Sequence, residues 1–389
     1  MSSEALTTCK PPLQVEVASS PPADWRQATL GDIIALEYGR SLPDKMRRAG
    51  DVPVYGSNGV VGWHDEALVP SGGIVIGRKG TAGSVTVSSQ PFWPIDTTYF
   101  VRARQPVDAD WLAAILLHCR LNELNEATGV PGLNRDKAYR QPVLLPPLDE
   151  QRRIAEVLRS VDEAIAAQRL TVEQHIRLID ANFEEWSLQP APTVALGDLL
   201  DFKNGINFEK DEKGKVGTLT LDVMNMFSAD MTPTYEGVYR ISKAVPPDLL
   251  LQRGDILFVR SSVKQQGIGW TSLADGFGEN TTFCGFIIRG RPKKADVLPQ
   301  YVVGTLRAPK YRRWLIQHST RSALTNINQK TIASVEIPLP GLYEQQSLVE
   351  QYEQLATASR DGSAALARLE RLRVHVAHNL LSGHVRVPA

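Results

Sequence analysis

The chain has 389 residues, of which 42% are hydrophobic and 22% charged, a composition typical of a soluble globular protein with one to three domains. It has no run of about 18 apolar residues to span a membrane, and its three scattered cysteines, Cys9, Cys119 and Cys284, fit neither a disulfide framework nor a zinc site and favour a reducing, cytoplasmic location. Because 43 basic and 43 acidic residues cancel, net charge alone does not indicate a nucleic-acid partner.

The N-terminal part divides into a tail and a globular domain. Residues 1–24 contain four prolines and no signal-peptide pattern, so we expect a loose tail. Residues 25–149 contain short β-branched or aromatic runs at 52–55, 74–76 and 99–101, separated by Gly-, Asn- and Pro-rich turns, and then a helical stretch at about 110–125. This order predicts a mixed domain with helices packed on a small sheet.

Residues 150–189 form a second segment, in which a long helix is predicted from Glu150 to Trp186. Its apolar residues follow each other at spacings of three and four, a heptad seam that faces a partner helix. The seam consists of Ile154, Leu158, Val161, Ile165, Val172, Ile179 and Phe183. About 37 residues at 1.5 Å each span roughly 55 Å, which argues against the alternative of a generic helix that only covers a small sheet.

Residues 190–343 are predicted to form a second mixed domain, with a helical stretch at about 299–317. This segment holds 19 Lys and Arg against 14 Asp and Glu, a net charge near +5. Residues 1–149 come out near −2 and residues 150–189 near −3. The neutral total therefore conceals a basic second domain and an acidic helix.

Residues 344–389 contain a second long helix, predicted from Glu344 to about Leu381. Its seam includes Leu355, Leu366, Leu369 and Val376. Ser359, Gly362 and Ser363 are weak helix formers, so we expect a bend or a loosely packed stretch at the centre. Two helices of equal length, one after each domain, would pair antiparallel and hold the domains at a fixed distance.

The landmarks of the first half recur in the second half in the same order. LGDI at 30–33 returns as LGDL at 196–199, and GGIVIGRKGT from Gly72 returns as GDILFVRSSV from Gly254. The sequences before and into the two helices, from Leu133 and from Ile327, also match. We therefore predict an α+β chain with a pseudo-two-fold repeat: two mixed α/β domains separated by a pair of long, antiparallel, coiled-coil-like helices. An old duplication without special use is the alternative.

The sequence lacks the motifs of an enzyme. It contains no GxxxxGK[ST] phosphate loop, no nucleophile elbow and no methyl-donor loop, and the acidic run EKDEK at 209–213 is more typical of a solvated surface loop than of a nuclease. His375, His378 and His384 have no acidic or cysteine companions, so we predict no metal site. The chain is expected to be non-catalytic.

Matched polar loops instead indicate DNA reading. Arg and Lys side chains suit guanine, Asn and Gln suit adenine, and the loops between strands carry these types at corresponding places in both halves. The base-reading candidates are Ser57, Asn58, Arg78, Lys79, Thr81, Arg260, Ser261, Lys264, Gln265 and Gln266. The phosphate-binding candidates are Arg40, Arg135, Lys137, Lys203, Lys293, Lys294, Arg312, Arg313 and Lys330. For any one of them, plain surface solvation is the alternative.

The chain resembles the specificity subunits of type I restriction-modification systems. The resemblance is carried by VPVYGSNGVVG at 52–62, GGIVIGRKGTAGSV at 72–85, DTTYFV at 96–101 and LLSGHVRV at 380–387. It is most specific in the proline-then-Glu-Gln entries LLPPLDEQRRIAEVL and IPLPGLYEQQ that lead into the two helices, and it covers nearly the whole chain.

The resemblance implies a division of labour between two target-recognition domains and two helices. Each domain would read one half of an asymmetric, bipartite target in double-stranded DNA, while the helices set the gap and dock two methylation subunits. Those partners would bind S-adenosylmethionine, and restriction subunits would join them; this chain would bind no cofactor. The alternative function is an interaction scaffold without DNA sequence selectivity.

Overall fold

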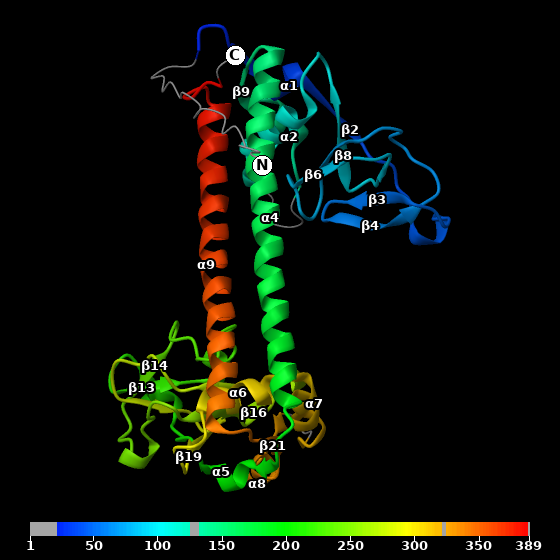
Figure 1. Cartoon of the computed structure of the whole chain (residues 1–389). Coiled ribbons are helices and arrows are strands. Elements are labelled where there is room, and N and C mark those ends of the chain that lie inside the picture. The colour runs from blue at the N-terminus through cyan, green and yellow to red at the C-terminus, as the bar shows by residue number, and fades with distance from the viewer. Residues whose placement is uncertain (1–21, 125–131, 321–323, 388–389) are drawn as a thin grey trace, which may run out of the picture. The chain divides into compact units, whose positions relative to one another are not determined.

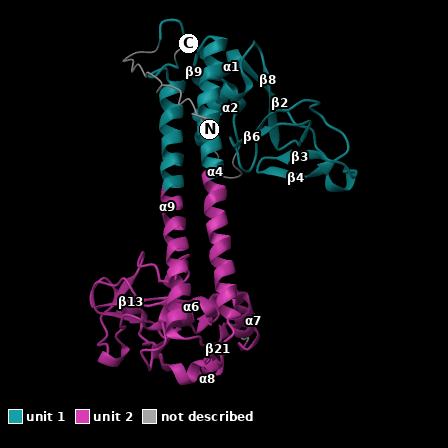
Figure 2. Cartoon of the chain, viewed as in Figure 1, with its two compact units in different colours: residues 1–167, 365–389 teal, residues 168–364 magenta. Residues whose placement is uncertain are grey.

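The computed structural model describes residues 22–124, 132–320 and 324–387, so most of the predicted N-terminal tail lies outside the described residues. The chain divides into two compact units (Figure 2). Unit 1 comprises residues 1–167 and 365–389, and unit 2 comprises residues 168–364. Each unit therefore holds one sheet-bearing domain and about half of each long helix.

The domain of unit 1 has the mixed α/β character that the sequence predicts (Figure 1). Its strands are β1 (Arg26–Thr29), β2 (Ile34–Tyr38), β3 (Val52–Gly56), β4 (Gly59–His64), β5 (Gly73–Gly77), β6 (Val85–Ser88), β7 (Trp93–Pro94), β8 (Thr98–Ala103) and β9 (Pro142–Leu145). Its helices are α1 (Leu30–Ile33), η1 (Asp44–Met46), α2 (Ala109–His118), η2 (Leu121–Leu124) and α3 (Arg135–Tyr139). The strands form sheets of order β2-β8-β5-β6, β4-β3-β7 and β1-β9.

The domain of unit 2 is also mixed. Its strands are β10 (Thr193–Ala195), β11 (Leu200–Asn204), β12 (Lys213–Gly214), β13 (Thr218–Leu221), β14 (Tyr239–Ile241), β15 (Ile256–Val259), β16 (Ser261–Ser262), β17 (Thr271–Leu273), β18 (Thr281–Phe283), β19 (Ile287–Pro292), β20 (Thr325–Asn326) and β21 (Glu336–Pro338). Its helices are α5 (Leu196–Leu199), η3 (Lys210–Glu212), η4 (Val223–Met226), η5 (Pro247–Leu249), η6 (Gln265–Gly267), α6 (Pro299–Arg307), α7 (Pro309–Gln317) and α8 (Gln329–Ala333).

The repeat seen in the sequence is also a repeat of topology. The antiparallel sheet β11-β19-β15-β17 of unit 2 has the same connectivity as β2-β8-β5-β6 of unit 1. The parallel pair β13·β18 corresponds to β3·β7, and the ladder β10·β21 corresponds to β1·β9. The predicted pseudo-two-fold repeat is therefore present in the fold.

Each domain has one predicted helical stretch near its end, at about 110–125 in unit 1 and 299–317 in unit 2, and each stretch is divided into two helices. The first ends at Cys119, and Arg120 adopts a left-handed backbone with φ of 45° before η2 begins. The second is interrupted at Ala308. This residue is extended because it precedes Pro309, and a proline ring clashes with a helical conformation of the residue before it. Both predicted stretches are therefore helical, and each consists of two helices.

A buried glutamine joins each domain to its long helix. The Gln151 side chain donates to the Pro146 carbonyl (2.9 Å) and accepts from the Asp108 amide (2.9 Å). Gln345 repeats both bonds, donating to the Pro340 carbonyl and accepting from the Leu298 amide, each at 2.9 Å. Asp108 and Leu298 cap α2 and α6. The proline-then-Glu-Gln motif therefore fixes the start of a long helix against the first main helix of its domain.

The long helices are α4 (Leu148–Ser187) and α9 (Leu342–Leu381), and within each unit they run antiparallel beside each other (Figure 1). In unit 1, Arg373 of α9 donates to both carboxylate oxygens of Asp162 of α4, at 3.0 and 3.1 Å. In both helices the predicted seam residues are buried or half-buried, whereas most of their neighbours on the other faces are exposed. The fold is the predicted one, two mixed domains with a pair of long antiparallel helices.

The centre of α9 is continuous and closely packed, so the predicted bend or loose stretch is wrong. The Gly362 carbonyl accepts a hydrogen bond from the Gln168 side chain of α4 at 3.1 Å. A Cβ atom on Gly362 would lie 3.1 Å from Val172 and 3.2 Å from Gln168. The weak helix former is therefore a point of close approach between the helices, which outweighs its low helix propensity.

The two ends of the described chain meet on unit 1 through a buried carboxylate. Glu150, at the start of α4, accepts from Trp25 (2.9 Å) and from the Arg386 guanidinium (2.6 and 3.0 Å). Arg386 also donates to both oxygens of Asp24, and the guanidinium holds the pKa of Asp24 below its ordinary value. Segments 22–25 and 382–387 are thus anchored to the base of the first long helix.

We predict that Arg386→Met destabilises unit 1 by about 2 kcal/mol, because the buried Glu150 carboxylate loses two charge-assisted hydrogen bonds. Hydrogen exchange measures this, with the amides of unit 2 as an internal reference. The matched control is Arg360→Met, which removes a pair between exposed Arg360 and Asp230 in unit 2 and should change protection there by well under about 1 kcal/mol. Equal protection of unit 1 with and without Arg386 contradicts the prediction.

Candidate nucleic-acid interface

In unit 1 the base-reading candidates gather at one end of the sheets. The turn after β3 carries Ser57 and Asn58, and the loop after β5 carries Arg78, Lys79 and Thr81. The two loops touch, because Ser84 donates from its hydroxyl to the Ser57 carbonyl at 2.6 Å. The two loops that carry these candidates therefore adjoin in the structure.

The corresponding loops of the two units share one hydrogen-bond pattern. The Arg78 amide donates to the Thr97 carbonyl at 2.8 Å, and the Arg260 amide donates to the Phe286 carbonyl at 2.8 Å. On the other side, the Leu133 amide donates to the Arg78 carbonyl and the Ile327 amide to the Arg260 carbonyl, both at 2.9 Å. Arg78 and Arg260 are therefore equivalent positions in the repeat, as the sequence alignment of the halves predicted.

Both arginine side chains brace the neighbouring loop. Arg78 donates from Nε to the Asp96 carbonyl at 3.0 Å, and Arg260 donates from Nη1 to the Gly285 carbonyl at 3.2 Å. Both are half-buried. Each guanidinium has five donors, so the bracing contact leaves donors for DNA. Base reading by these arginines stays a prediction.

A tyrosine that the sequence analysis missed lies among the arginines of unit 1. The Tyr38 ring is 54% exposed, and the guanidinium carbons of Arg78 and Arg135 lie 5.4 and 5.3 Å from its centroid. Gly39 then brings the chain so close to β7 that a Cβ would lie 2.2 Å from the Ile95 carbonyl oxygen. The internal repeat could have indicated this position, because unit 2 has a glycine at the equivalent place. A Cβ on Gly205, which follows Asn204, would lie 2.1 Å from the Cys284 carbonyl oxygen.

Arg135 and Lys137 lie on α3, whose N-cap Asn134 accepts from the amides of residues 136 and 137. Asn328 caps α8 in the same way, and the following Gln329 donates to the Asn204 side chain at 2.9 Å. Lys330 is exposed on that helix. The starts of α3 and α8 thus belong to the same end of each unit as the loops that carry the base-reading candidates.

In unit 2 the exposed candidates are Lys264 and Gln266, with Gln265 half-buried. Ser261 differs from the prediction: it is buried in β16, which pairs with β20, and its hydroxyl donates to Asn326 at 2.5 Å. Its hydroxyl is therefore engaged in holding the loop, and we withdraw it as a base reader.

Arg312 also differs from the prediction. Its guanidinium donates to the carbonyls of Gln266 and Ile268, each at 2.8 Å, and lies over the Trp270 ring at 5.3 Å. Burial, with a smaller contribution from Arg307, lowers the pKa of Arg312 to about 10. This side chain shapes the loop from Gln265 to Ile268 from behind and is not available for a phosphate. The neighbouring Arg313 is exposed.

The lysine candidates of unit 2 do not all lie together. Lys203 is ion-paired with Asp248. Lys293 donates to the Gly197 carbonyl at 2.6 Å. Lys293 and Lys294 follow the C-terminal end of β19. The first residue of that strand, Ile287, pairs with Val259 beside the Arg260 loop. The length of a strand therefore separates Lys293 and Lys294 from the reading loops. In unit 1, Arg40 is exposed and follows Gly39 at the reading end.

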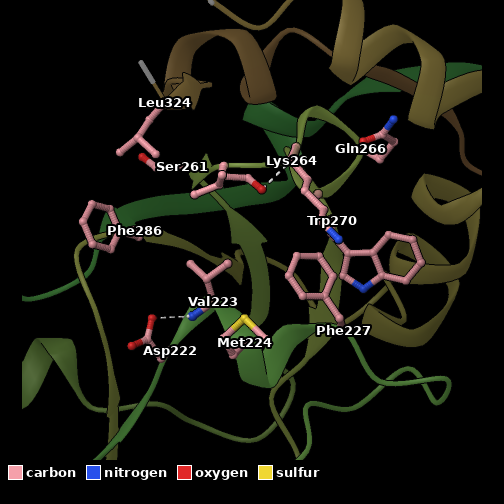
Figure 3. Close-up of a pocket in the computed structure, with 13 residues that line it drawn as sticks. Asp222, Val223, Met224, Phe227, Ser261, Lys264, Gln266, Trp270, Phe286 and Leu324 are labelled. Carbon is pink, nitrogen blue, oxygen red and sulfur yellow. Dashed lines mark hydrogen bonds between the residues drawn. The ribbon is translucent and has the colours of Figure 1, made fainter. Parts of the chain in front are cut away.

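A cavity of about 680 Å³ opens between the loops of unit 2 (Figure 3). Met224 and Phe227 come from η4 and the residue after it, Val263 from the loop after β16, and Phe286 from the loop before β19. Isolated Met, Val and Phe residues give no periodic signal, so a role for these apolar residues could not be predicted from the sequence.

The described residues 22–124, 132–320 and 324–387 contain no group of three or more His, Cys, Asp or Glu side chains placed to hold a metal ion. Nor does any helix in those ranges have the length and apolar character needed to cross a membrane.

Comparison with known proteins gives one consistent result. Residues 22–176 match the model of the type I restriction modification DNA specificity domain. The specificity subunit of the type I restriction enzyme MjaVIII from Methanocaldococcus jannaschii is 20% identical over 341 residues, which is 82% of this chain and 77% of that protein. The specificity subunit of EcoKI from Escherichia coli is 26% identical over 254 residues, 59% of this chain and 54% of that protein.

Solved structures share the fold. A chain from a structural study of complex assembly and conformational transition of the type I R-M system aligns with a TM-score of 0.64 at 18% identity, covering 94% of this chain and all of that one. The S subunit of a type I restriction-modification system from M. genitalium aligns with a TM-score of 0.58 at 14% identity, covering 94% and 97%. Residues 22–176 therefore match a DNA specificity domain of type I restriction-modification systems, and the chain is similar to specificity subunits of such systems in sequence and in fold.

Proposed function

We propose that each unit of this specificity subunit reads one half of an asymmetric, bipartite DNA target, and that α4 and α9 set the unread gap between the halves. The observation that carries the proposal is the shared loop frame. Arg78 and Arg260 make the same main-chain bonds, yet the exposed residues beside them differ: Lys79 and Thr81 in unit 1, Lys264 and Gln266 in unit 2. A common frame with different side chains suits two readers of different sequences.

A chain of this family works together with DNA and with other restriction-modification subunits. We infer more specifically that the long helices dock two methylation subunits, that those subunits supply S-adenosylmethionine, and that restriction subunits join the cytoplasmic complex. A pseudo-two-fold molecule supports two equivalent docking places, because α4 and α9 each follow one domain and have equal length.

Methylome sequencing tests the function as a whole. Cells that express the methylation subunits with this chain should carry one bipartite adenine-methylation motif with two unlike halves, and cells without the chain should lose that motif alone. If the motif persists without the chain, or if the chain recruits the methylation subunits without any sequence selectivity, the interaction-scaffold function is the better description.

Substitution of the two equivalent arginines tests the assignment of one half-site to each unit. We predict that Arg78→Ala relaxes base preference in one half of the motif and that Arg260→Ala relaxes it in the other, by about 1–3 kcal/mol of discrimination each, because each arginine supports a single reading loop. Binding-site selection with the assembled complex measures both halves at once. Equal loss across both halves from either variant would show general phosphate contacts instead.

A change of helix length tests the gap. Seven residues inserted after Ala167 in α4 and after Ala364 in α9, at the division between the units, preserve the heptad seam and lengthen each helix by about 10 Å. At about 3.4 Å per base pair, we predict a gap longer by about three base pairs. Replacement of one heptad in each helix without insertion is the control. A selected motif with an unchanged gap would refute the spacing role.

A further inference from the structure

The cavity of unit 2 lies between the same three loops that form the reading end of unit 1. In unit 1 the turn after β3, the loop after β5 and the segment before β8 meet; in unit 2 their equivalents are η4 after β13, the loop after β15 and β16, and the segment before β19. The Arg260 amide bond to the Phe286 carbonyl fixes this correspondence. The cavity is therefore part of the proposed reading surface of the second domain.

The wall of the cavity is apolar (Figure 3). Phe286 lies on one side, Phe227 and Trp270 on the other, with Val223 and Met224 below. At its rim, Val263 is 84% exposed and Met224 is 78% exposed, which places large apolar side chains where solvent would otherwise favour polar ones.

Two polar side chains of the wall, Asp222 and Ser262, are already engaged, whereas the covered indole Nε1 of Trp270 has no hydrogen-bond partner. Asp222 accepts from the Val223 amide (2.7 Å) and from the Tyr239 hydroxyl (3.0 Å), and Ser262 donates to the Lys264 carbonyl (2.7 Å). An extruded base would need several hydrogen bonds for its pairing edge, and the single covered indole N–H of Trp270 would leave most of them unsatisfied. The wall suits an apolar group presented by an otherwise intact duplex.

The apolar group that a base presents in the major groove of DNA is the C5 methyl of thymine. Lys264 and Gln266 at the rim supply hydrogen-bond donors for base edges or phosphates next to such a methyl. The cavity of about 680 Å³ is wide enough for methyls of neighbouring base pairs.

We propose that the second domain selects thymine in its half-site through the C5 methyl, which packs against the apolar residues Met224, Phe227, Val263 and Phe286. This inference rests on the proposed function, since it names the base that one half of the reading surface prefers. Unit 1 presents Lys79 and Thr81 from the corresponding loop, so its half-site should depend less on thymine methyls.

Replacement of thymine by uracil tests the proposal, because it removes the methyl and keeps every hydrogen-bonding group. The complex of this chain with its methylation subunits is titrated with duplexes of the methylome-derived target. We expect Kd to rise about fourfold for each contacted methyl removed from the half that Arg260→Ala relaxes, which corresponds to about 0.8 kcal/mol per buried carbon. The same replacement in the other half should change Kd less than twofold.

Variants of the chain complete the test. Val263→Ser should bring the ratio of uracil to thymine Kd in that half close to one, whereas Val216→Ser, at a valine of unit 2 that is 78% exposed and not part of the cavity, should leave the ratio unchanged. An unchanged Kd with uracil, or a half-site without thymine on either strand, overturns the proposal while the bipartite function stands.

Two further outcomes also count against the thymine proposal. If Val263→Ser weakens binding of the methylation subunit and leaves the uracil ratio unaltered, the cavity holds a protein partner. If the unmodified duplex binds no better than a scrambled one, the proposed function itself fails, and the thymine proposal fails with it.

Discussion

The buried glutamine at the start of each long helix is the contact on which the arrangement of each unit depends. Gln151 and Gln345 each bond to a proline carbonyl of the strand exit and to the capping amide of α2 or α6. Three segments (strand exit, domain helix and long helix) are thereby held at one point. Loss of either side chain would leave a buried amide and a buried carbonyl unsatisfied, a cost of about 1–3 kcal/mol for each group. The position of each reading surface on its helix follows from this joint.

At the reading end, main-chain contacts hold the loops in place, and exposed side chains are left to select the bases. Main-chain bonds at Arg78 and Arg260, and the close approaches at Gly39 and Gly205, are the same in both units and do not depend on which base is read. The exposed residues beside the two arginines differ between the units: Lys79 is exposed in unit 1 and Lys264 in unit 2. Backbone geometry can thus be kept while side chains change, which is how one fold reads different sequences.

Periodic features could be predicted from the sequence and non-periodic ones could not. The heptad seams gave both long helices to within two residues, because burial on one face imposes a repeat of three and four. The strands at 52–56, 73–77 and 98–103 followed from β-branched runs between turn residues. The interruption at Ala308 was readable from Pro309, but Arg120 carries no such signal.

The errors at the candidate site have the same origin. The sequence of a basic helix does not show which of its arginines faces solvent. Arg312 turns inward because it donates to the carbonyls of Gln266 and Ile268 and packs over the Trp270 ring. Gly362 was read as a weak helix former, although its small size is what allows α4 to approach. Both outcomes depend on partners far away in sequence, and a single chain read residue by residue does not contain them.

Both ends of strand β8 in unit 1 carry charges of both signs. The strand β8 runs from Thr98 at the reading end to Ala103, and the acidic residues Asp108 and Asp110 follow that far end, where Asp110 pairs with Arg159 of α4. Arg40, Lys79 and Arg135 lie at the reading end, together with the exposed Asp96. A domain near −2 overall therefore still has three cations where a phosphate backbone would lie. Each surface has few cations and can therefore neutralise few phosphates, and each neutralised phosphate contributes only about −0.9 to the slope of log K against log salt concentration. Affinity would therefore depend on both units binding one duplex together. Two weak readers that must bind at once discriminate more strongly than either alone, and this is the physical advantage of a duplicated chain.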